Sequence, residues 1–196
     1  RNQSWCFNPA NTSSLLLKNN VTVIHDIIPV TNPGWYSLQA RIYYRILLPL
    51  VIRNAKLLIT VSEATKKDIH KHIGVPLEKI HIAGNAVSDF WQKVEEKPTI
   101  DNYILTVGSL DPRKNLKRII ESFLLLEDNS LSLVIVGHKH KAFANLDLSI
   151  PEQDSKRIFF TGYVTDEEIR TFYSHAKVFV YVSLKEGFGI PPLEAM

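Results

Sequence analysis

Two glutamates, Glu186 and Glu194, bracket the stretch EGFGIPPLE near the end of the chain. Carboxylates so placed could form an acid–base pair, a metal site, a ligand clamp or an ordinary helix start. An acid–base pair needs a set separation across the cleaved bond, which sequence does not give. No third acidic or histidine ligand lies nearby, so we expect no metal site. We favour a clamp for a hydroxyl-rich ligand, because a carboxylate that accepts sugar hydroxyls gains ~1.5–3 kcal/mol.

The residues around the two glutamates differ in what they suggest. Gly187 and Gly189 let the backbone approach a ligand closely. One of the next two prolines is expected to begin a helix, which places Glu194 in its first turn, where the dipole favours a carboxylate. An ordinary structural role is therefore a strong alternative for Glu194 and a weaker one for Glu186.

A basic pair, Arg113 and Lys114, stands where a helix is expected to begin. Asp111 fits the N-cap and Pro112 the first position of a helix over 113–127. Cations in the first turn oppose the helix dipole at ~0.3–1 kcal/mol each. An anion bound in front of the helix would make the two cations favourable there, because it would contact them together with free backbone N–H groups.

The residues Gly108 and Ser109 precede this pair and end an expected strand. In open α/β sheets ligands bind off the carboxyl ends of strands. The segment therefore indicates a phosphate site, and a solvated surface pair remains the alternative. The glycine spacing of a P-loop or of a dinucleotide fingerprint is not present in the sequence.

The composition limits the classes of protein that fit. With 196 residues and 45% hydrophobic residues, the chain can bury a real core. A formal net charge of +3 is too small to indicate nucleic-acid binding. The single cysteine, Cys6, excludes an internal disulfide and a multi-cysteine zinc site, and it favours a reducing compartment. No run reaches the ~18–20 apolar residues of a membrane span.

Hydrophobic periodicity predicts two successive series of strands and helices. The first series comprises strand 21–30, helix 37–55, strand 56–61, helix 62–73 and strand 79–85. The second comprises strand 103–109, helix 113–127, strands 131–137 and 157–162, helix 166–176 and strand 178–183. Alternating strands and helices imply parallel pairing with right-handed crossovers, so the predicted fold class is α/β with two Rossmann-like parallel-sheet domains.

The domain boundary is expected where periodicity is lost and charge gathers. We assign 1–88 to an N-terminal domain, 89–101 to a linker and 102–196 to a C-terminal domain. The first series has few strands, the second stops at a helix start, and the chain begins with Arg1. We therefore expect a fragment in which both domains are truncated.

One helical segment, ARIYYRILLPLVIRNAK, combines arginines with tyrosines and aliphatic residues. Pro49 should kink it. We favour an internal helix packed on its sheet, because basic and apolar residues do not segregate cleanly. Peripheral contact with an anionic membrane surface is the alternative.

Several motifs, taken together and in order, resemble the retaining family-4 glycosyltransferases. They are HDIIPV, ITVSEATKKDI, KIHIAGNAV, VGSLDPRKNL, LVIVG, FTGYVTDEEIRTFYSHA and EGFGIPPLEAM. The resemblance covers the whole chain and implies the two-domain GT-B fold. One departure is Val182, which stands where the family usually has proline.

The resemblance also implies roles for single residues. Arg113 and Lys114 would hold the donor diphosphate, and Glu194 would contact the nucleotide ribose. Glu186 would contact the sugar hydroxyls, and His25 would lie near the transferred sugar; these two are the candidate catalytic residues. The backbone of Gly187, Phe188 and Gly189 would lie against sugar and phosphate.

The activity implied is a hexosyl transfer that retains anomeric configuration and needs no divalent metal or other cofactor. The donor would be a UDP- or GDP-sugar, and the acceptor a saccharide or lipid-linked saccharide in polysaccharide biosynthesis. We expect a cytoplasmic protein, with the inner face of the cytoplasmic membrane as one location, and no nucleic-acid partner. Two alternatives stay open: a catalytically incomplete nucleotide- or carbohydrate-binding fragment, and a sugar-nucleotide epimerase on the same fold.

Overall fold

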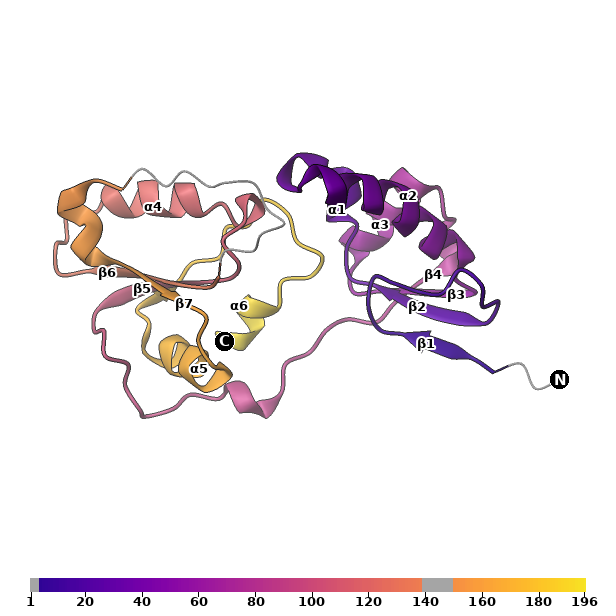
Figure 1. The fold of residues 1–196 in the computed structure, drawn as a ribbon. Coiled ribbons are helices and arrows are strands. Elements are labelled where there is room, and N and C mark those ends of the chain that lie inside the picture. The colour runs from indigo at the N-terminus through magenta and orange to yellow at the C-terminus, as the bar shows by residue number, and fades with distance from the viewer. Residues whose placement is uncertain (1–3, 139–149) are drawn as a thin grey trace. The chain divides into compact units, whose positions relative to one another are not determined.

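The computed structural model describes residues 4–138 and 150–196. Its contacts divide the chain into two compact units (Figure 1). The first comprises Arg1–Asn85 with Glu186–Phe188, and the second Ala86–Lys185 with Gly189–Met196. Each unit contains a four-stranded parallel sheet, so the predicted α/β class with two parallel-sheet domains is confirmed.

The first sheet has the order β1-β2-β3-β4, so each strand pairs with the next one along the chain. Its strands are β1 (Cys6–Asn8), β2 (Asn20–Ile24), β3 (Leu57–Thr60) and β4 (Ile80–Ile82). The helices are α1 (Ile28–Thr31), α2 (Leu38–Asn54) and α3 (Glu63–Ile73), with 3₁₀ turns η1 (Pro33–Trp35) and η2 (Leu77–Lys79). Sequence reasoning missed β1, whose three residues CFN are too short to show a period.

The helices of the first unit lie on one face of its sheet (Figure 1). The buried cluster on that face is formed by residues of β2, β3, β4, α2 and α3, together with Ile27 just before α1. Its members are Ile24, Ile27, Leu48, Ile52, Leu58, Ile69, Ile73 and Ile80. Ser62 caps α3 by accepting the Thr65 N–H, and Gly74 ends it at φ 80°. Serine is a favoured N-cap, and glycine is a favoured residue in the left-handed conformation at a helix end. The helix α2 continues through Pro49.

The second sheet has the order β7-β6-β5-β8. Its strands are β5 (Tyr103–Val107), β6 (Ser132–Val136), β7 (Ile158–Gly162) and β8 (Val178–Phe179). The helices are α4 (Leu116–Leu124), α5 (Asp166–His175) and α6 (Ile190–Glu194), with 3₁₀ turns η3 (Asp89–Trp91), η4 (Pro112–Lys114) and η5 (Glu152–Arg157). The 3₁₀ turn η3 lies inside the segment that sequence reasoning assigned to a linker.

Both faces of the second sheet are covered, as Figure 1 shows with α4 on one side and α5 and α6 on the other. Alternate residues of β6 point to opposite faces. Leu133 and Ile135 pack with α4, while Val134 and Val136 pack against α5. Near-continuous burial of this kind is what a central parallel strand requires, and it explains the run LSLVIVG.

Two predicted elements of the second unit have the wrong bounds. The expected helix 113–127 begins only at Leu116, because Asn115 adopts the left-handed conformation at φ 58° and separates η4 from α4. The expected strand 178–183 pairs only over Val178–Phe179. Beyond that point the chain leaves β5, and the Leu184 N–H donates to the Arg113 carbonyl at 2.7 Å.

Candidate functional site

The carboxyl end of β5 carries two of the expected phosphate-site residues, Gly108 and Ser109. The Gly108 N–H donates to the Val136 carbonyl at 2.9 Å, which ties this turn to the end of β6. Gly108 has φ 152°, and a Cβ there would lie 3.1 Å from Cε of Lys114. The glycine therefore leaves room for the lysine side chain to pass over the strand end.

The turn η4 supplies the basic pair, and a buried carboxylate organises it. Asp111 has 0% of its surface exposed. It accepts the Arg113 N–H at 3.0 Å and the Ser109 hydroxyl at 2.5 Å. Asp111 was expected to cap a helix over 113–127; it is an N-cap, but of the turn η4, whereas Asn115 precedes α4. The two cations belong to a 3₁₀ turn ahead of α4, however, so the helix-dipole argument based on a first α-helical turn was wrong.

The two basic side chains contact different partners. Arg113 is 19% exposed and its Nε lies 3.3 Å from the Asp111 carboxylate. Lys114 instead reaches Tyr181, with Nζ 3.3 Å from the hydroxyl oxygen and 5.0 Å from the ring centroid. A phosphate group at this site would therefore meet the Lys114 ammonium, which an aromatic ring holds, whereas the Arg113 guanidinium is paired with a carboxylate.

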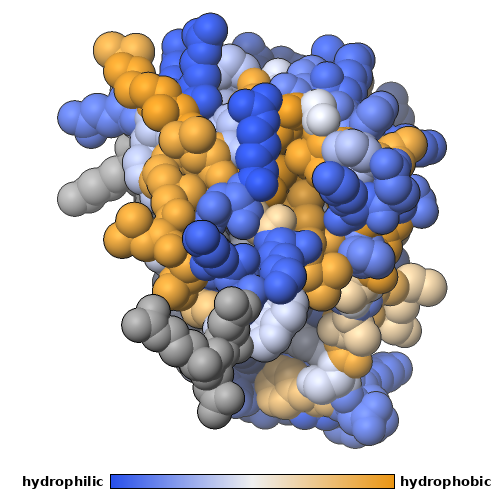
Figure 2. All heavy atoms as spheres, turned by 90° about the vertical axis from the view of Figure 1, so that its right-hand side faces the viewer, coloured by the Kyte–Doolittle hydropathy of each residue, from blue (hydrophilic) through white to orange (hydrophobic). Residues whose placement is uncertain are grey.

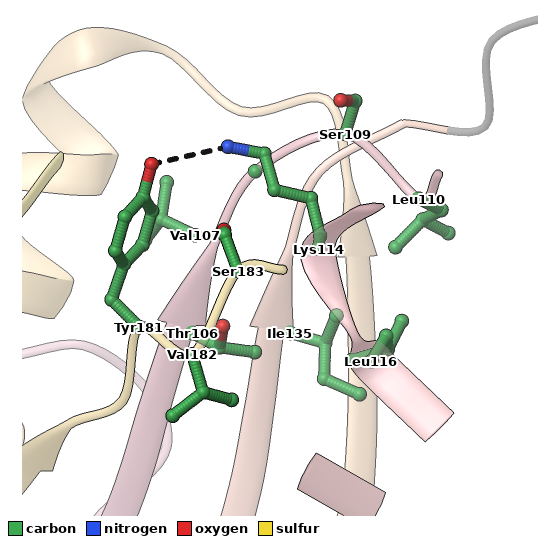
Figure 3. A pocket seen from close by; sticks show the side chains of 11 residues that line it. Thr106, Val107, Ser109, Leu110, Lys114, Leu116, Ile135, Tyr181, Val182 and Ser183 are labelled. Atoms are coloured by element: carbon green, nitrogen blue, oxygen red, sulfur yellow. Dashed lines mark hydrogen bonds between the residues drawn. The ribbon is translucent and has the colours of Figure 1, made fainter. Parts of the chain in front are cut away.

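A pocket opens between the ends of β5 and β6 and the segment after β8 (Figure 3). Its cavity volume is about 10 Å³, roughly the space of one water molecule. Three of the expected donor-site residues line it: Gly108, Ser109 and Lys114. Tyr181 and Ser183 line it too, and sequence reasoning did not select them. No strand pattern points to them, because β8 ends at Phe179 and Val182 between them lines the pocket as well.

Glu194 lies elsewhere in the same unit and is also held by a tyrosine. The Tyr173 hydroxyl donates to its Oε2 at 3.1 Å. Burial raises the pKa of Glu194, the hydrogen bond from Tyr173 lowers it, and the charge of Asp166 raises it. Burial followed by the charge of Glu194 raises the pKa of Tyr173. The hydroxyl therefore offsets part of the cost of keeping this half-buried carboxylate ionised.

The helix that carries Glu194 differs from the expected one. Gly189 precedes it at φ 96°, so α6 begins at Ile190, ahead of both prolines. Glu194 is then the last residue of α6 and not part of its first turn. The dipole argument offered for Glu194 was wrong, and its hydrogen bond to Tyr173 is the contact that orients it.

The remaining expected residues belong to the first unit. His25 directly follows β2 and is exposed. Its Nε2 lies 2.7 Å from the Pro9 carbonyl, so this nitrogen carries the proton when the ring is neutral. The His25 backbone N–H donates to Asn11 Oδ1 at 2.8 Å. The contact with Pro9 orients the imidazole, and the contact with Asn11 holds the backbone at the carboxyl end of β2, where a histidine can meet a ligand.

The segment Glu186–Phe188 is grouped with the same unit. The Gly187 carbonyl accepts hydrogen bonds from the hydroxyls of Ser62 and Thr65. A Cβ on Gly187 would collide with the His25 carbonyl. Glycine is thus required for this close approach to the His25 backbone, whereas the sequence suggested a close approach to a ligand. Ser62 does more than cap α3, which the sequence pattern alone did not reveal.

Two properties of the described residues bear on the nature of the site: their potential metal ligands and the character of their helices. Within 4–138 and 150–196, no three His, Cys, Asp or Glu side chains gather in a group that could hold a metal ion. Among the helices in those ranges, none has the length and apolar character to cross a membrane.

Comparison with known proteins identifies the relatives of this chain. A family model described as glycosyl transferases group 1 matches residues 87–196, and one described as glycosyltransferase family 4 matches residues 7–89. The chain is 34% identical over 183 residues to O-antigen chain mannosyltransferase RfbU of Salmonella typhimurium LT2, covering 92% of this chain and 50% of that protein. It is 28% identical to O-antigen chain mannosyltransferase B of Escherichia coli, covering 92% and 51%.

Solved structures share the fold at low sequence identity. WaaG, a glycosyltransferase involved in lipopolysaccharide biosynthesis, has a TM-score of 0.69 at 16% identity and covers 97% of this chain and 56% of that one. HepE of Anabaena, solved with UDP-glucose, has a TM-score of 0.65 at 19% identity and covers 90% and 50%. The chain spans about half the length of the curated relatives it matches. By its family match and its fold, the chain belongs to the glycosyl transferases group 1 family, on the GT-B fold.

Proposed function

We propose that the protein containing this chain is a retaining hexosyltransferase. It moves a sugar from a nucleotide-diphospho-sugar to a saccharide or lipid-linked acceptor in polysaccharide biosynthesis. The observation that carries this proposal is the Lys114 ammonium at a pocket formed by Gly108, Ser109 and the carboxyl ends of two parallel strands. The names of the relatives, which include O-antigen mannosyltransferases, support the class of reaction.

The donor diphosphate would lie at this pocket. Lys114 offers an ammonium there, and Arg113 adds a second positive charge whose orientation Asp111 sets. These charges stabilise the negative charge that develops on the leaving diphosphate, the role that a divalent metal ion plays in other transferases. We therefore propose that the reaction is independent of metal.

The sugar and the nucleoside would be held by the two glutamates. Glu194 would accept the ribose hydroxyls, and Glu186 would accept sugar hydroxyls beside the backbone of Gly187, Phe188 and Gly189. His25 would lie near the transferred sugar. In a front-face attack, the acceptor oxygen bonds to an oxocarbenium-like anomeric carbon as the diphosphate leaves and takes the acceptor's proton. Glu186 then acts by charge and position, with no covalent intermediate.

Substitution of Lys114 tests the donor site directly. In the full-length protein, Lys114→Ala should weaken binding of UDP or GDP at least about tenfold and lower kcat/KM further, because a charge-assisted phosphate contact is lost. Lys117→Ala is the matched control, since Lys117 is 59% exposed on α4 and pairs only loosely with Glu121 at 4.0 Å. Calorimetry with UDP and GDP, and turnover with UDP-glucose and GDP-mannose, supply the measurements.

The outcomes separate the proposal from its two alternatives. Nucleotide binding without turnover, with any acceptor saccharide supplied, would indicate a binding protein. Conversion of one sugar nucleotide into another in the absence of acceptor would indicate an epimerase. Equal affinity in wild type and Lys114→Ala would show that the diphosphate does not bind at this pocket.

We also propose that the protein works on the cytoplasmic side of the membrane and touches the bilayer through α2. Leu38, Ile42 and Ile46 are 69%, 55% and 61% exposed at a spacing of four. Arg41 and Arg45 are exposed in the adjacent row, and α2 contains no acidic residue. Figure 2 looks onto the first unit, where apolar side chains reach the surface between polar ones. Such a face suits an anionic lipid surface.

A further inference from the structure

A row of three aromatic rings crosses the second unit. Tyr173 of α5 meets Phe179 of β8 edge to face, with ring centroids 5.2 Å apart at 85°. On its other side Phe179 stacks on Tyr181 at 6.1 Å and 27°. Trp91 supports Tyr173 from η3 at 5.8 Å. Phe179 thus fixes where the two tyrosine rings lie relative to each other.

Each tyrosine hydroxyl of this row contacts one charged residue of the proposed donor site. The Tyr181 hydroxyl accepts from Nζ of Lys114 at 3.3 Å, as drawn in Figure 3. The Tyr173 hydroxyl donates to Oε2 of Glu194 at 3.1 Å. The ammonium and the carboxylate come from different elements, η4 and α6, and share this row as their common support.

We propose that Tyr173, Phe179 and Tyr181 form a positioning device that sets the Lys114 ammonium and the Glu194 carboxylate at the separation a nucleoside diphosphate requires. The inference rests on the proposed function, since it assigns these two groups to the phosphate and the ribose. The tyrosines are positioning residues, because each acts through the charged group that it holds.

The physical benefit is preorganisation. A lysine side chain loses much rotamer freedom when a ligand fixes it, and this loss of entropy weakens binding. Tyr181 supplies a hydroxyl acceptor and a ring face to Lys114 before any ligand arrives, so less ordering remains for the binding step. A tyrosine is a suitable support because it has only two side-chain torsions.

The second benefit concerns the charge on Glu194. The carboxylate accepts ribose hydroxyls most strongly when it is ionised. Burial is the largest influence on the pKa of Glu194 and raises it. The two side chains that act on it are both on α5: the Tyr173 hydroxyl lowers this pKa, and the charge of Asp166 raises it. Removal of the Tyr173 hydroxyl should therefore raise that pKa, so that nucleotide affinity is lost at a higher pH on acidification.

The test uses three tyrosine-to-phenylalanine variants of the full-length protein, each of which removes one hydroxyl and leaves the ring. Tyr173→Phe and Tyr181→Phe should each weaken UDP or GDP binding about two- to tenfold by calorimetry. Tyr103→Phe is the matched control. Tyr103 belongs to the same unit, and its hydroxyl donates to the Phe172 carbonyl at 2.8 Å, so the loss of this hydroxyl should lower thermal stability and leave affinity unchanged.

The pH dependence separates positioning from mere stability. Nucleotide affinity is measured from pH 5 to 8. The pH below which affinity falls should be higher in Tyr173→Phe than in wild type, and unchanged in Tyr181→Phe and Tyr103→Phe. A carbon-13 titration of glutamate carboxyls, with Glu194→Gln used to assign the signal, reports the same shift without any nucleotide.

The results distinguish failure of this inference from failure of the proposed function. Suppose that wild type binds UDP or GDP, and that Tyr173→Phe and Tyr181→Phe bind it equally well with the same pH dependence. The positioning device then does not exist. If wild type binds neither nucleotide, the proposed function fails, and the carboxyl titration still decides the role of Tyr173. An unchanged Glu194 titration in Tyr173→Phe would overturn the inference in that case too.

Phe179 offers a further check on the row as a unit. Phe179→Leu keeps an apolar side chain but removes the ring that both tyrosines pack against. It should weaken nucleotide binding, and Tyr181→Phe should then cost less in this background than in wild type, because coupled residues are not additive. If the effects of the two substitutions on affinity are fully additive, Phe179 does not position Tyr181, the residue that holds Lys114.

Discussion

At the scale of single residues, Asp111 determines how the basic pair is presented. It is fully buried, and a buried carboxylate is stable only when hydrogen bonds and positive charge surround it. The Ser109 hydroxyl, the Arg113 N–H and the Arg113 guanidinium provide them. Arg113 and Lys114 are neighbours in sequence, yet this carboxylate draws one of them away from the aromatic ring that holds the other.

Replacement of this carboxylate should be costly. Asp111→Asn removes the charge that balances Arg113 and one acceptor oxygen, so we expect the free energy of unfolding to fall by about 3 kcal/mol. Urea unfolding measures it. Asp101→Asn changes an exposed aspartate of the same unit and should stay within about 0.5 kcal/mol of wild type. A neutral effect of Asp111→Asn would mean that the buried network does not hold η4.

At the scale of elements, the carboxyl ends of β5 and β6 are held in close register. Gly108 and Gly137 follow directly after these strands, with φ of 152° and 150°. The Gly137 N–H donates to the Gly162 carbonyl at 3.1 Å, which links β6 to the end of β7. A Cβ on Gly137 would fall onto the Gly108 carbonyl, so these turns can pack this closely only with glycine.

Gly137→Ala should therefore damage the site from outside it. The backbone conformation is strained for alanine and the Gly108 carbonyl must move, so we expect about 1–3 kcal/mol of lost stability and weaker nucleotide binding. Gly34→Ala is the control, because a Cβ there meets nothing within 4 Å. Chemical denaturation and calorimetry compare the two, and equal behaviour would show that the turn after β6 can relax without cost.

At the scale of the whole molecule, charge and apolar exposure bear on the proposed membrane contact. The formal net charge is only +3, so attraction to an anionic surface must come from local basic residues. Arg41 and Arg45 on α2 stand beside the exposed row of Leu38, Ile42 and Ile46. Apolar insertion and basic attraction act together at a bilayer interface.

Vesicle binding tests this proposed contact. The full-length protein should sediment with vesicles that contain phosphatidylglycerol and much less with pure phosphatidylcholine. Arg45→Glu should weaken that binding at least about fivefold, since each basic residue near the surface contributes about 1 kcal/mol. Lys67→Glu makes the same change of charge at an exposed position of α3 and should have little effect on vesicle binding. Equal loss in both variants would indicate a diffuse attraction with no defined face.

The sequence by itself determined the α/β class, the parallel sheets and the family. Such features follow from local hydrophobic periods and from short motifs, which depend on residues close together in the chain. Ser62 as the cap of α3 and Asp111 as the cap of η4 were predictable for the same reason, because a cap is a local hydrogen bond.

Only the tertiary structure decided how the charged side chains are held. Asn115 was free by sequence to continue a helix, but its left-handed conformation places Arg113 and Lys114 in a separate turn. Tyr173 and Tyr181 were not selected from the sequence. Their hydroxyls orient Glu194 and Lys114, which lie 21 and 67 residues away along the chain. No local pattern encodes such pairings, because side chains distant in sequence meet only once the sheet has folded.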